Sequence, residues 1–468
     1  MPEAQVAART SQGRWVLAAA VLGSGMAMLD GTVVNIALRK IGDDLDASIA
    51  QLQWVANAYL LALASLILVG GSLGDHLGRK RVFLVGVGWF AVASALCGVA
   101  QTSGQLIVAR LLQGVGAALL TPGSLAMIQG SFRRADRAKV IGQWAGLGGI
   151  AAALGPLLGG WIIDHASWRW IFGINVPVAV AVVLVAARHV PESRDPEATR
   201  GFDVLGAALG AIGLGAATYA LIENGTAPPV RVAVAAAVGV ASMVMFVVYE
   251  RQHRNALVPM HLFGSRTFSV VNGLTLLVYG ALGTLLFFLV LQLQVVTGWS
   301  PLAAGLATLP LTLVMLLLSS RSGALAGRIG PRIPLTVGPV LCAAGTLLLR
   351  GVDRDTGYVT GVLPGVLVFG SGLVLLVAPL TSSVLAAAPD RYAGIASGVN
   401  NAVARTGSLL AVSALPAAVG IVGDAYRHPV AFDAGYGRAL LVCAALLLLG
   451  AAVAFLGLPG RPPSNADR

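Results

Sequence analysis

Long apolar stretches, separated by short polar segments, recur along the whole chain of 468 residues. A helix needs roughly 20 consecutive, mostly apolar residues to cross a lipid bilayer. Fourteen stretches satisfy this length, and each is predicted to be a membrane-spanning helix. They cover residues 15–38, 53–72, 82–100, 105–130, 138–163, 169–188, 203–223, 231–249, 268–296, 301–320, 333–350, 358–387, 393–422 and 436–458. The pattern therefore predicts an all-α integral membrane protein.

The composition agrees with a chain that is surrounded by lipid. Apolar residues make up 57% of the sequence and charged residues only 11%, whereas soluble domains carry roughly 25% charged residues. The formal net charge of +11 is spread between the apolar stretches and forms no basic face, which argues against a nucleic-acid partner. The sequence has no phosphate-binding loop and no metal-ligand or catalytic-triad pattern. We therefore expect no enzyme activity, no metal and no cofactor.

The basic residues also predict how the chain is oriented. With the N-terminus in the cytoplasm, about 21 of the 31 Lys and Arg residues fall in cytoplasmic segments, as the positive-inside rule requires. The main clusters are 79–81, 133–139 and 251–254. Both ends, residues 1–14 and 459–468, are therefore predicted to be cytoplasmic, in a multi-pass protein of the bacterial inner membrane.

An internal repeat divides the chain into two halves. The segment GSLGDHLGRKR at 71–81 follows the second predicted helix, and GALAGRIGPR at 323–332 follows the tenth. The pair Gly114 and Gly116 is echoed by Gly370 and Gly372. The offset of eight helices predicts two six-helix bundles, 15–190 and 256–458, joined by a linker at 191–255 that holds two extra helices.

Five motifs carry a resemblance to a known family. GSLGDHLGRKRV (71–82) and LIVARLLQGVGAALLTPG (106–123) resemble two signatures of the major facilitator superfamily, and LGPLLGG (154–160) resembles its antiporter signature. MLDGTVVNIAL (28–38) and WRWIFGINVP (168–177) resemble the fourteen-helix drug:proton antiporters. The resemblance covers nearly the whole chain and implies a major facilitator fold with fourteen membrane helices.

Asp30 and Arg110 are the candidate proton-coupling residues. A carboxylate inside a spanning helix is costly and is usually functional. Asp30 lies about 12 Å and Arg110 about 8 Å from the outer ends of their predicted helices, at 1.5 Å per residue. At similar depths, the arginine favours the charged form of the carboxylate while burial opposes it. A change in their separation would load or release a proton, and the resemblance also implies proton transfer at Arg110. A static buried pair is the alternative.

The loop between the second and third predicted helices is a candidate gate. Gly74 and Gly78 permit a tight turn, and Asp75 is placed to meet a helix N-terminus or an arginine. Arg79 and Lys80 flank the membrane. The resemblance implies a cytoplasmic latch that stabilises an outward-facing state, whereas the simpler interpretation is a basic turn at the membrane surface.

Further candidates have less specific support. Gly155, Pro156, Gly159 and Gly160 form the antiporter helix motif, although such residues also serve simple helix packing. The candidate substrate or second proton sites are Glu223, Asn35, Arg405 and Asn401. Glu223 is better explained as a solvated carboxylate at a helix end. Trp161, Trp168, Trp170 and Trp299 are expected to be anchors at the membrane interface.

Together these features predict a proton-coupled antiporter that exports small amphipathic compounds, such as drugs or antibiotics, by alternating access. The proton gradient is the expected energy source, and the substrate is expected to be a small, cationic and lipophilic molecule that reaches the protein from the lipid bilayer or the cytoplasm. A dedicated exporter of one metabolite or self-made antibiotic is an alternative within the same class. A non-transporting receptor or a channel is the alternative from another class. The sequence does not indicate an oligomeric state.

Overall fold

The computed structural model describes residues 6–194, 203–253, 256–389 and 392–460. Helices dominate these ranges, and 13 of them are long and apolar enough to cross a membrane. A further helix, α15 (Ala393–Ala418), has 26 residues but carries Asn400, Asn401 and Arg405 in its middle. The observed helices are thus compatible with the fourteen predicted spans. Arg254 and residues 461–468, predicted to be cytoplasmic, lie outside the described ranges.

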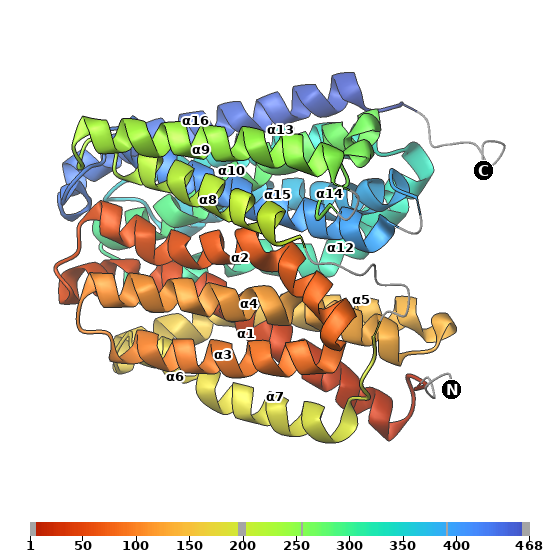
Figure 1. Cartoon of the computed structure of the whole chain (residues 1–468). Coiled ribbons are helices and arrows are strands. Elements are labelled where there is room, and N and C mark those ends of the chain that lie inside the picture. The colour runs from red at the N-terminus through yellow and green to blue at the C-terminus, as the bar shows by residue number, and fades with distance from the viewer. Residues whose placement is uncertain (1–5, 195–202, 254–255, 390–391, 461–468) are drawn as a thin grey trace. The chain divides into compact units, whose positions relative to one another are not determined.

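The first compact unit comprises Met1–Ala47, Gln51–Gly215 and Ala241–Leu257. Within it α1 packs against α5 and α7, and α3 packs against α4 and α7; α3 and α4 run side by side in Figure 1. Several helices extend beyond their apolar stretch, because helical hydrogen bonding continues through the polar residues at the membrane surface. The helices are α1 (Ser11–Asp44), α2 (Ile49–Leu77), α3 (Arg79–Val99), α4 (Ser103–Ser131), α5 (Arg134–His165), α6 (Trp170–Gly173) and α7 (Asn175–His189).

The second compact unit comprises Ser48–Ala50, Ala216–Val240 and Val258–Arg468. Within it α10 packs against α15 and α16, α13 packs against α14 and α16, and α12 packs against α14. The predicted span 301–320 is divided at Thr308 into α11 and α12. The helices are α10 (Arg266–Val295), α11 (Pro301–Ala307), α12 (Leu309–Ile329), α13 (Arg332–Leu349), α14 (Leu363–Ala386), α15 and α16 (Pro429–Gly457), with a short π-helical turn at Tyr358–Val362 before α14.

The two units repeat the same packing pattern. The contacts α1·α5, α1·α7, α3·α4 and α3·α7 of the first unit correspond to α10·α15, α10·α16, α13·α14 and α13·α16 of the second. This correspondence agrees with the sequence repeat, which aligned the α2–α3 loop with the α12–α13 loop. The bounds 15–190, 191–255 and 256–458 that we assign to the bundles and linker stay predictions.

Glycines allow the repeated helix pairs to approach closely. A Cβ atom on Gly116 in α4 would lie 2.7 Å from the backbone nitrogen of Phe90 in α3. A Cβ on Gly372 in α14 would lie 2.5 Å from the carbonyl oxygen of Gly338 in α13. Both contacts involve backbone atoms, which have no room to give way, so a larger residue would separate each helix pair.

The two extra helices are α8 (Val204–Ile222) and α9 (Pro229–Gln252). Each is divided between the two units, at Gly215 and at Val240. Asp203 caps the N-terminal end of α8, because its Oδ1 accepts a hydrogen bond from the Gly206 N–H at 2.7 Å. Such a side chain satisfies a backbone donor that the helix itself leaves open.

Candidate functional site

Asp30 lies near the middle of α1 and is only 1% exposed. The helix starts at a cap in which the Thr10 hydroxyl accepts a hydrogen bond from the Gly13 N–H. It then continues without a proline to Asp44, which places Asp30 about 21 Å along the axis from that end. A carboxylate at such a depth needs a partner or water.

Arg110 in α4 provides that partner. Its Nη1 lies 2.5 Å from Asp30 Oδ2, and the arginine is itself 1% exposed. Its Nε donates to the carbonyl oxygen of Val55 in α2 at 3.1 Å. The guanidinium carbon lies 4.5 Å from the centre of the Tyr59 ring, a cation–π contact. The structure thus brings together the two residues that the sequence proposed as a pair.

Three uncharged polar side chains complete the cluster around Asp30. Gln113 in α4 donates to Asp30 Oδ1 at 2.8 Å and accepts from Arg110 Nη1 at 2.6 Å. Asn175 in α7 donates to Asp30 Oδ1 at 3.3 Å and to Ser94 Oγ at 2.9 Å. The Ser94 hydroxyl in α3 in turn donates to the Phe172 carbonyl at 3.0 Å. Asp30 is therefore held by side chains from two helices besides its own.

The polar cluster is electrically balanced while both charged residues are ionised. Removing one partner of a buried ion pair costs about 3–5 kcal/mol, because the other charge is left buried and unpaired. A proton added to Asp30 has the same electrical effect as removing its charge, so it weakens the hold on Arg110. The charge balance of the cluster therefore depends on whether the Asp30 carboxylate is ionised.

The sequence alone does not point to Gln113, Asn175 or Ser94. Gln113 follows Arg110 by three residues and so shares its face of the helix, which is a usable signal. Asn175 lies inside the WRWIFGINVP segment, so the motif marked it without giving it a role. Ser94 had no signal, because a single serine in an apolar helix is commonly bonded to its own backbone.

The α2–α3 connection turns tightly at Gly78, whereas Gly74, which was predicted to share the turn, lies inside α2. Gly78 adopts φ +115°, a conformation that side chains rarely tolerate. Asp75, in the last turn of α2, accepts hydrogen bonds from Arg79 at 2.8 and 3.0 Å. Of the two partners that we expected for Asp75, the arginine is the one observed.

Glu192 is a further charged residue at this loop that the sequence did not reveal. Its carboxylate accepts hydrogen bonds from the backbone N–H groups of Lys80 at 3.0 Å and Arg81 at 3.3 Å. A carboxylate at a helix N-terminus is stabilised by the helix dipole and satisfies open donors. The Lys80 ammonium donates to the Ala187 carbonyl at 2.9 Å. The segment after α7 is thereby tied to the start of α3, and no motif spacing predicts this long-range contact.

The glycines of the predicted antiporter motif lie where α5 meets α1. A Cβ on Gly155 would lie 2.2 Å from Thr32 Oγ1, and one on Gly159 would lie 2.8 Å from Val33 Cγ1. Pro156 is inside the helix, and Gly160 is buried. These residues set a close helix contact directly beside the turn of α1 that carries Asp30.

Asn35 and Glu223 lie apart from the polar cluster. Asn35 is half-buried and follows Asp30 by five residues, which places it about 140° around α1. Glu223 directly follows the end of α8 and accepts a hydrogen bond from the Thr226 hydroxyl at 2.7 Å. This position matches the predicted carboxylate at a helix end.

The polar residues of α15 lie in the second unit. Asn400 donates to Asn272 Oδ1 at 3.1 Å and to Thr275 Oγ1 at 2.8 Å, both on α10. Asn401 and Arg405 are half-buried. Arg405 is twelve residues from the start of a 26-residue helix, and at such mid-membrane depth an arginine faces protein or a water-filled cavity rather than lipid.

The prediction that Trp168 is a membrane anchor was wrong. Trp168 is 2% exposed and donates through Nε1 to Asp44 Oδ2 at 3.0 Å. Arg169 contacts the same carboxylate at 2.6 Å and stacks on the Trp168 ring. The indole thus takes part in a polar contact that joins the C-terminal end of α1 to the segment before α6. By contrast, Trp161 and Trp170 are exposed, as anchors would be.

Comparison with known proteins places this geometry in a family context. The model of the Major Facilitator Superfamily matches residues 20–412. The tetracenomycin C resistance and export protein of Streptomyces glaucescens is 35% identical over 379 residues, which cover 80% of this chain and 70% of that protein. The methylenomycin A resistance protein of Bacillus subtilis is 36% identical over 356 residues, 75% of each chain.

A third relative is the multidrug resistance protein Stp of Mycobacterium tuberculosis, 34% identical over 379 residues, with 80% of this chain and 70% of that protein covered. Among solved structures, a bacterial homologue of the lysosomal transporter Spinster matches with a TM-score of 0.68 at 17% identity, covering 96% of this chain and 97% of that one. A D-xylose–proton symporter matches with a TM-score of 0.67 at 14% identity, covering 96% and 99%. These structural matches establish the fold.

Proposed function

Because the chain belongs to the major facilitator superfamily, we propose that it is a proton-coupled antiporter that exports small amphipathic compounds by alternating access. Its relatives are named for resistance to antibiotics and drugs and for their export. The observation that carries the proposal is the buried ion pair between Asp30 and Arg110. Export out of the cytoplasm would be driven by protons that move inward.

The proton step follows from the contacts of Asp30. In the ionised state its two carboxylate oxygens accept hydrogen bonds from Arg110, Gln113 and Asn175. A proton that reaches the carboxylate from outside removes the negative charge, so the attraction to Arg110 is lost and α1 is free to shift against α4. Release of that proton to the cytoplasm restores the ion pair, and one proton has then crossed the membrane.

The α2–α3 loop is proposed to be the cytoplasmic latch of this cycle. Asp75 and Arg79 are joined by an ion pair, Gly78 makes the turn, and Glu192 binds the first turn of α3. Gly74 lies one turn before Gly78 in α2. The side chains of Arg79 and Asp75 are 16% and 38% exposed, so water reaches this ion pair and screens it, which allows the latch to open.

Substrate contact is proposed for the polar side chains that the Asp30 cluster does not use. In the part of the chain that the structure describes, neither Asn401 nor Arg405 makes a hydrogen bond or an ion pair. Asn35 is half-buried on α1, one to two turns from Asp30. Glu223 remains a candidate second proton site, or a contact for a cationic compound, at the end of α8.

Transport by the purified protein in liposomes tests the proposal. The lumen is made acidic, and tetracenomycin C and methylenomycin A are added outside in turn, since relatives are named for them. We expect at least one compound to enter the vesicles while the lumen becomes more alkaline, as a dye in the lumen reports. Both fluxes are expected to disappear in Asp30→Asn.

The exposed loop residue Asp353 provides the control, since Asp353→Asn removes a carboxylate outside the cluster and is expected to transport normally. Uptake of a compound without a change of luminal pH would contradict proton coupling and indicate a facilitator. The dedicated exporter and the multidrug exporter are distinguished by whether one or several compounds are taken up.

A further inference from the structure

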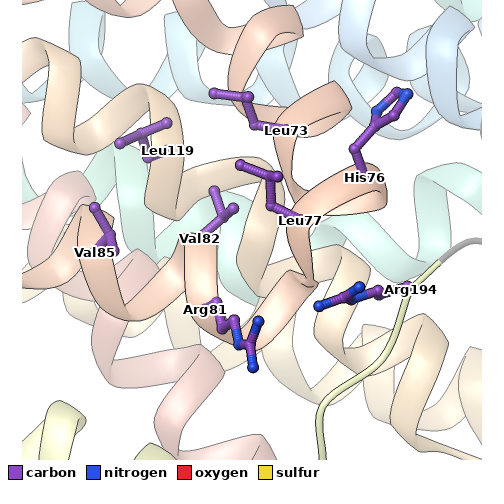
Figure 2. A pocket seen from close by; sticks show the side chains of 8 residues that line it. All are labelled: Leu73, His76, Leu77, Arg81, Val82, Val85, Leu119 and Arg194. Carbon is purple, nitrogen blue, oxygen red and sulfur yellow. The ribbon is translucent and has the colours of Figure 1, made fainter. Parts of the chain in front are cut away.

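A groove of about 360 Å³ lies where α2, α3 and α4 of the first unit approach the α2–α3 loop. Leu73 and Leu77 of α2, Val85 of α3 and Leu119 of α4 form its apolar wall (Figure 2). The groove is next to the predicted latch, but none of its lining residues takes part in the Asp30 cluster.

One end of the groove carries two arginines from segments far apart in sequence. Figure 2 shows the side chains of Arg81, at the start of α3, and Arg194, beyond α7, at the same end of the groove. The Arg81 side chain is 70% exposed, and its Nε lies 3.8 Å from Glu192 Oε2, at the outer limit of an ion pair. The neighbouring Arg79 is instead engaged by Asp75. This end therefore presents two guanidinium groups that are available to an anion.

The other end of the groove continues into a surface that faces lipid. Beyond Val85, the large apolar residues of α3 that are exposed are Trp89, Val92, Leu96 and Val99. They recur every three or four residues, which is the spacing of one helix face. An apolar stripe of this length on a membrane helix is covered by acyl chains. The groove is therefore complementary to an anionic phospholipid. Its cationic end lies at the membrane surface, where a headgroup would lie, and its apolar end points toward the bilayer core, where an acyl chain would lie.

We propose that this groove binds one anionic phospholipid of the leaflet on the side of the α2–α3 loop. The phosphate accepts hydrogen bonds from Arg81 and Arg194, and an acyl chain lies along Leu73, Val85 and Leu119. Basic pockets between membrane helices on the cytoplasmic side are suited to anionic headgroups, and guanidinium groups bind phosphate oxygens in pairs. The bound lipid links the start of α3 to the segment after α7, beside the Glu192 contact.

Native mass spectrometry of the full chain tests this lipid site. The protein is taken from bilayers of equal phosphatidylglycerol and phosphatidylcholine, and the bound lipids are counted. The wild type is expected to retain one phosphatidylglycerol in preference to phosphatidylcholine. The double variant R81Q/R194Q is expected to weaken that retention by about 30-fold, since each basic residue near a membrane surface contributes about one kcal/mol toward an anionic lipid.

Three comparisons make the result specific. Arg188→Gln removes an exposed arginine of α7 outside the groove and is expected to leave retention unchanged. Leu119→Trp fills the groove without changing its charge and is expected to reduce retention. Asp30→Asn is expected to bind the lipid normally, so failure of the export proposal is distinguished from failure of this one. A thermal melt of each variant checks that it is folded.

The proposal is overturned if phosphatidylcholine is retained equally, or if the folded double variant keeps its phosphatidylglycerol. It is also overturned if inorganic phosphate alone displaces the lipid, because the site would then recognise free phosphate rather than a lipid with its acyl chain.

Discussion

At the scale of the residue, the main feature is a buried carboxylate whose negative charge is balanced by a buried arginine. Asp30 and Arg110 are each 1% exposed and lie in contact through Asp30 Oδ2, and Gln113 and Asn175 donate to the other carboxylate oxygen, Oδ1. In a medium of low polarity such a network is strong when complete and costly when broken. The energy of the cluster therefore depends on whether the proton is present.

This dependence predicts a coupled effect of two substitutions. Asp30→Asn and Arg110→Gln should each lower the free energy of unfolding by about 3–5 kcal/mol, because each leaves one charge buried alone. The double variant D30N/R110Q has no unpaired charge and should be more stable than either single variant. Denaturant or thermal unfolding in detergent measures this coupling, and strictly additive effects would show that the two charges do not interact.

Part of this site could be predicted from the sequence and part could not. Asp30 and Arg110 stood out, because charged residues within apolar stretches are rare and require partners. Gln113, Asn175 and Ser94 carry no charge, and their role depends on the packing of α3, α4 and α7, which spacing along one helix does not reveal. The role of Glu192 could not be predicted for a similar reason, since it binds a helix start more than a hundred residues earlier in the chain.

At the scale of the element, glycines decide how closely helices approach and where they turn. Gly155 and Gly159 bring α5 against α1, and Gly116 brings α4 against α3. Gly78 ends α2 and begins α3 within one residue, through its positive φ. These positions are fixed by sterics, so they are sensitive to the addition of a single methyl group.

Two glycines of α5 form a matched pair that tests the packing. Gly155→Ala places a Cβ 2.2 Å from Thr32 Oγ1, whereas Gly149→Ala meets no atom within 4 Å. Overpacking of this kind costs about 1–3 kcal/mol, so Gly155→Ala should lower the melting temperature, while Gly149→Ala should leave it unchanged or raise it. Equal melting temperatures for the two variants would argue against a close α1–α5 contact at Gly155.

The α2–α3 loop allows a second matched comparison. Gly78→Ala forces an alanine into φ +115° and places its Cβ 2.7 Å from the Glu192 carboxylate, a strain of about 1–3 kcal/mol. Gly74 lies within α2, and a Cβ there meets nothing closer than 3.9 Å. Gly78→Ala should therefore reduce both stability and transport rate, while Gly74→Ala should have little effect. Comparable losses from both variants would contradict this prediction, because they would show that the positive φ of Gly78 is not what makes the loop sensitive.

At the scale of the whole molecule, the chain is built from two units with the same pattern of helix contacts. The sequence predicted this architecture well, because the length of the apolar stretches and the repeat of the loop motif are both properties of the one-dimensional pattern. The helix ends were predicted less well. Polar residues extend α1 to Asp44, and Thr308 divides one predicted span into α11 and α12.

Proton-coupled export, as proposed, requires that Asp30 is the group whose proton is exchanged for substrate. The most direct test is the proton release that accompanies binding of the transported compound to the detergent-solubilised protein in weakly buffered solution. We expect release of about one proton per wild-type protein as the compound binds, and none from the folded variants Asp30→Asn and D30N/R110Q. Release of the same number of protons by these variants, with the compound still bound, would contradict it.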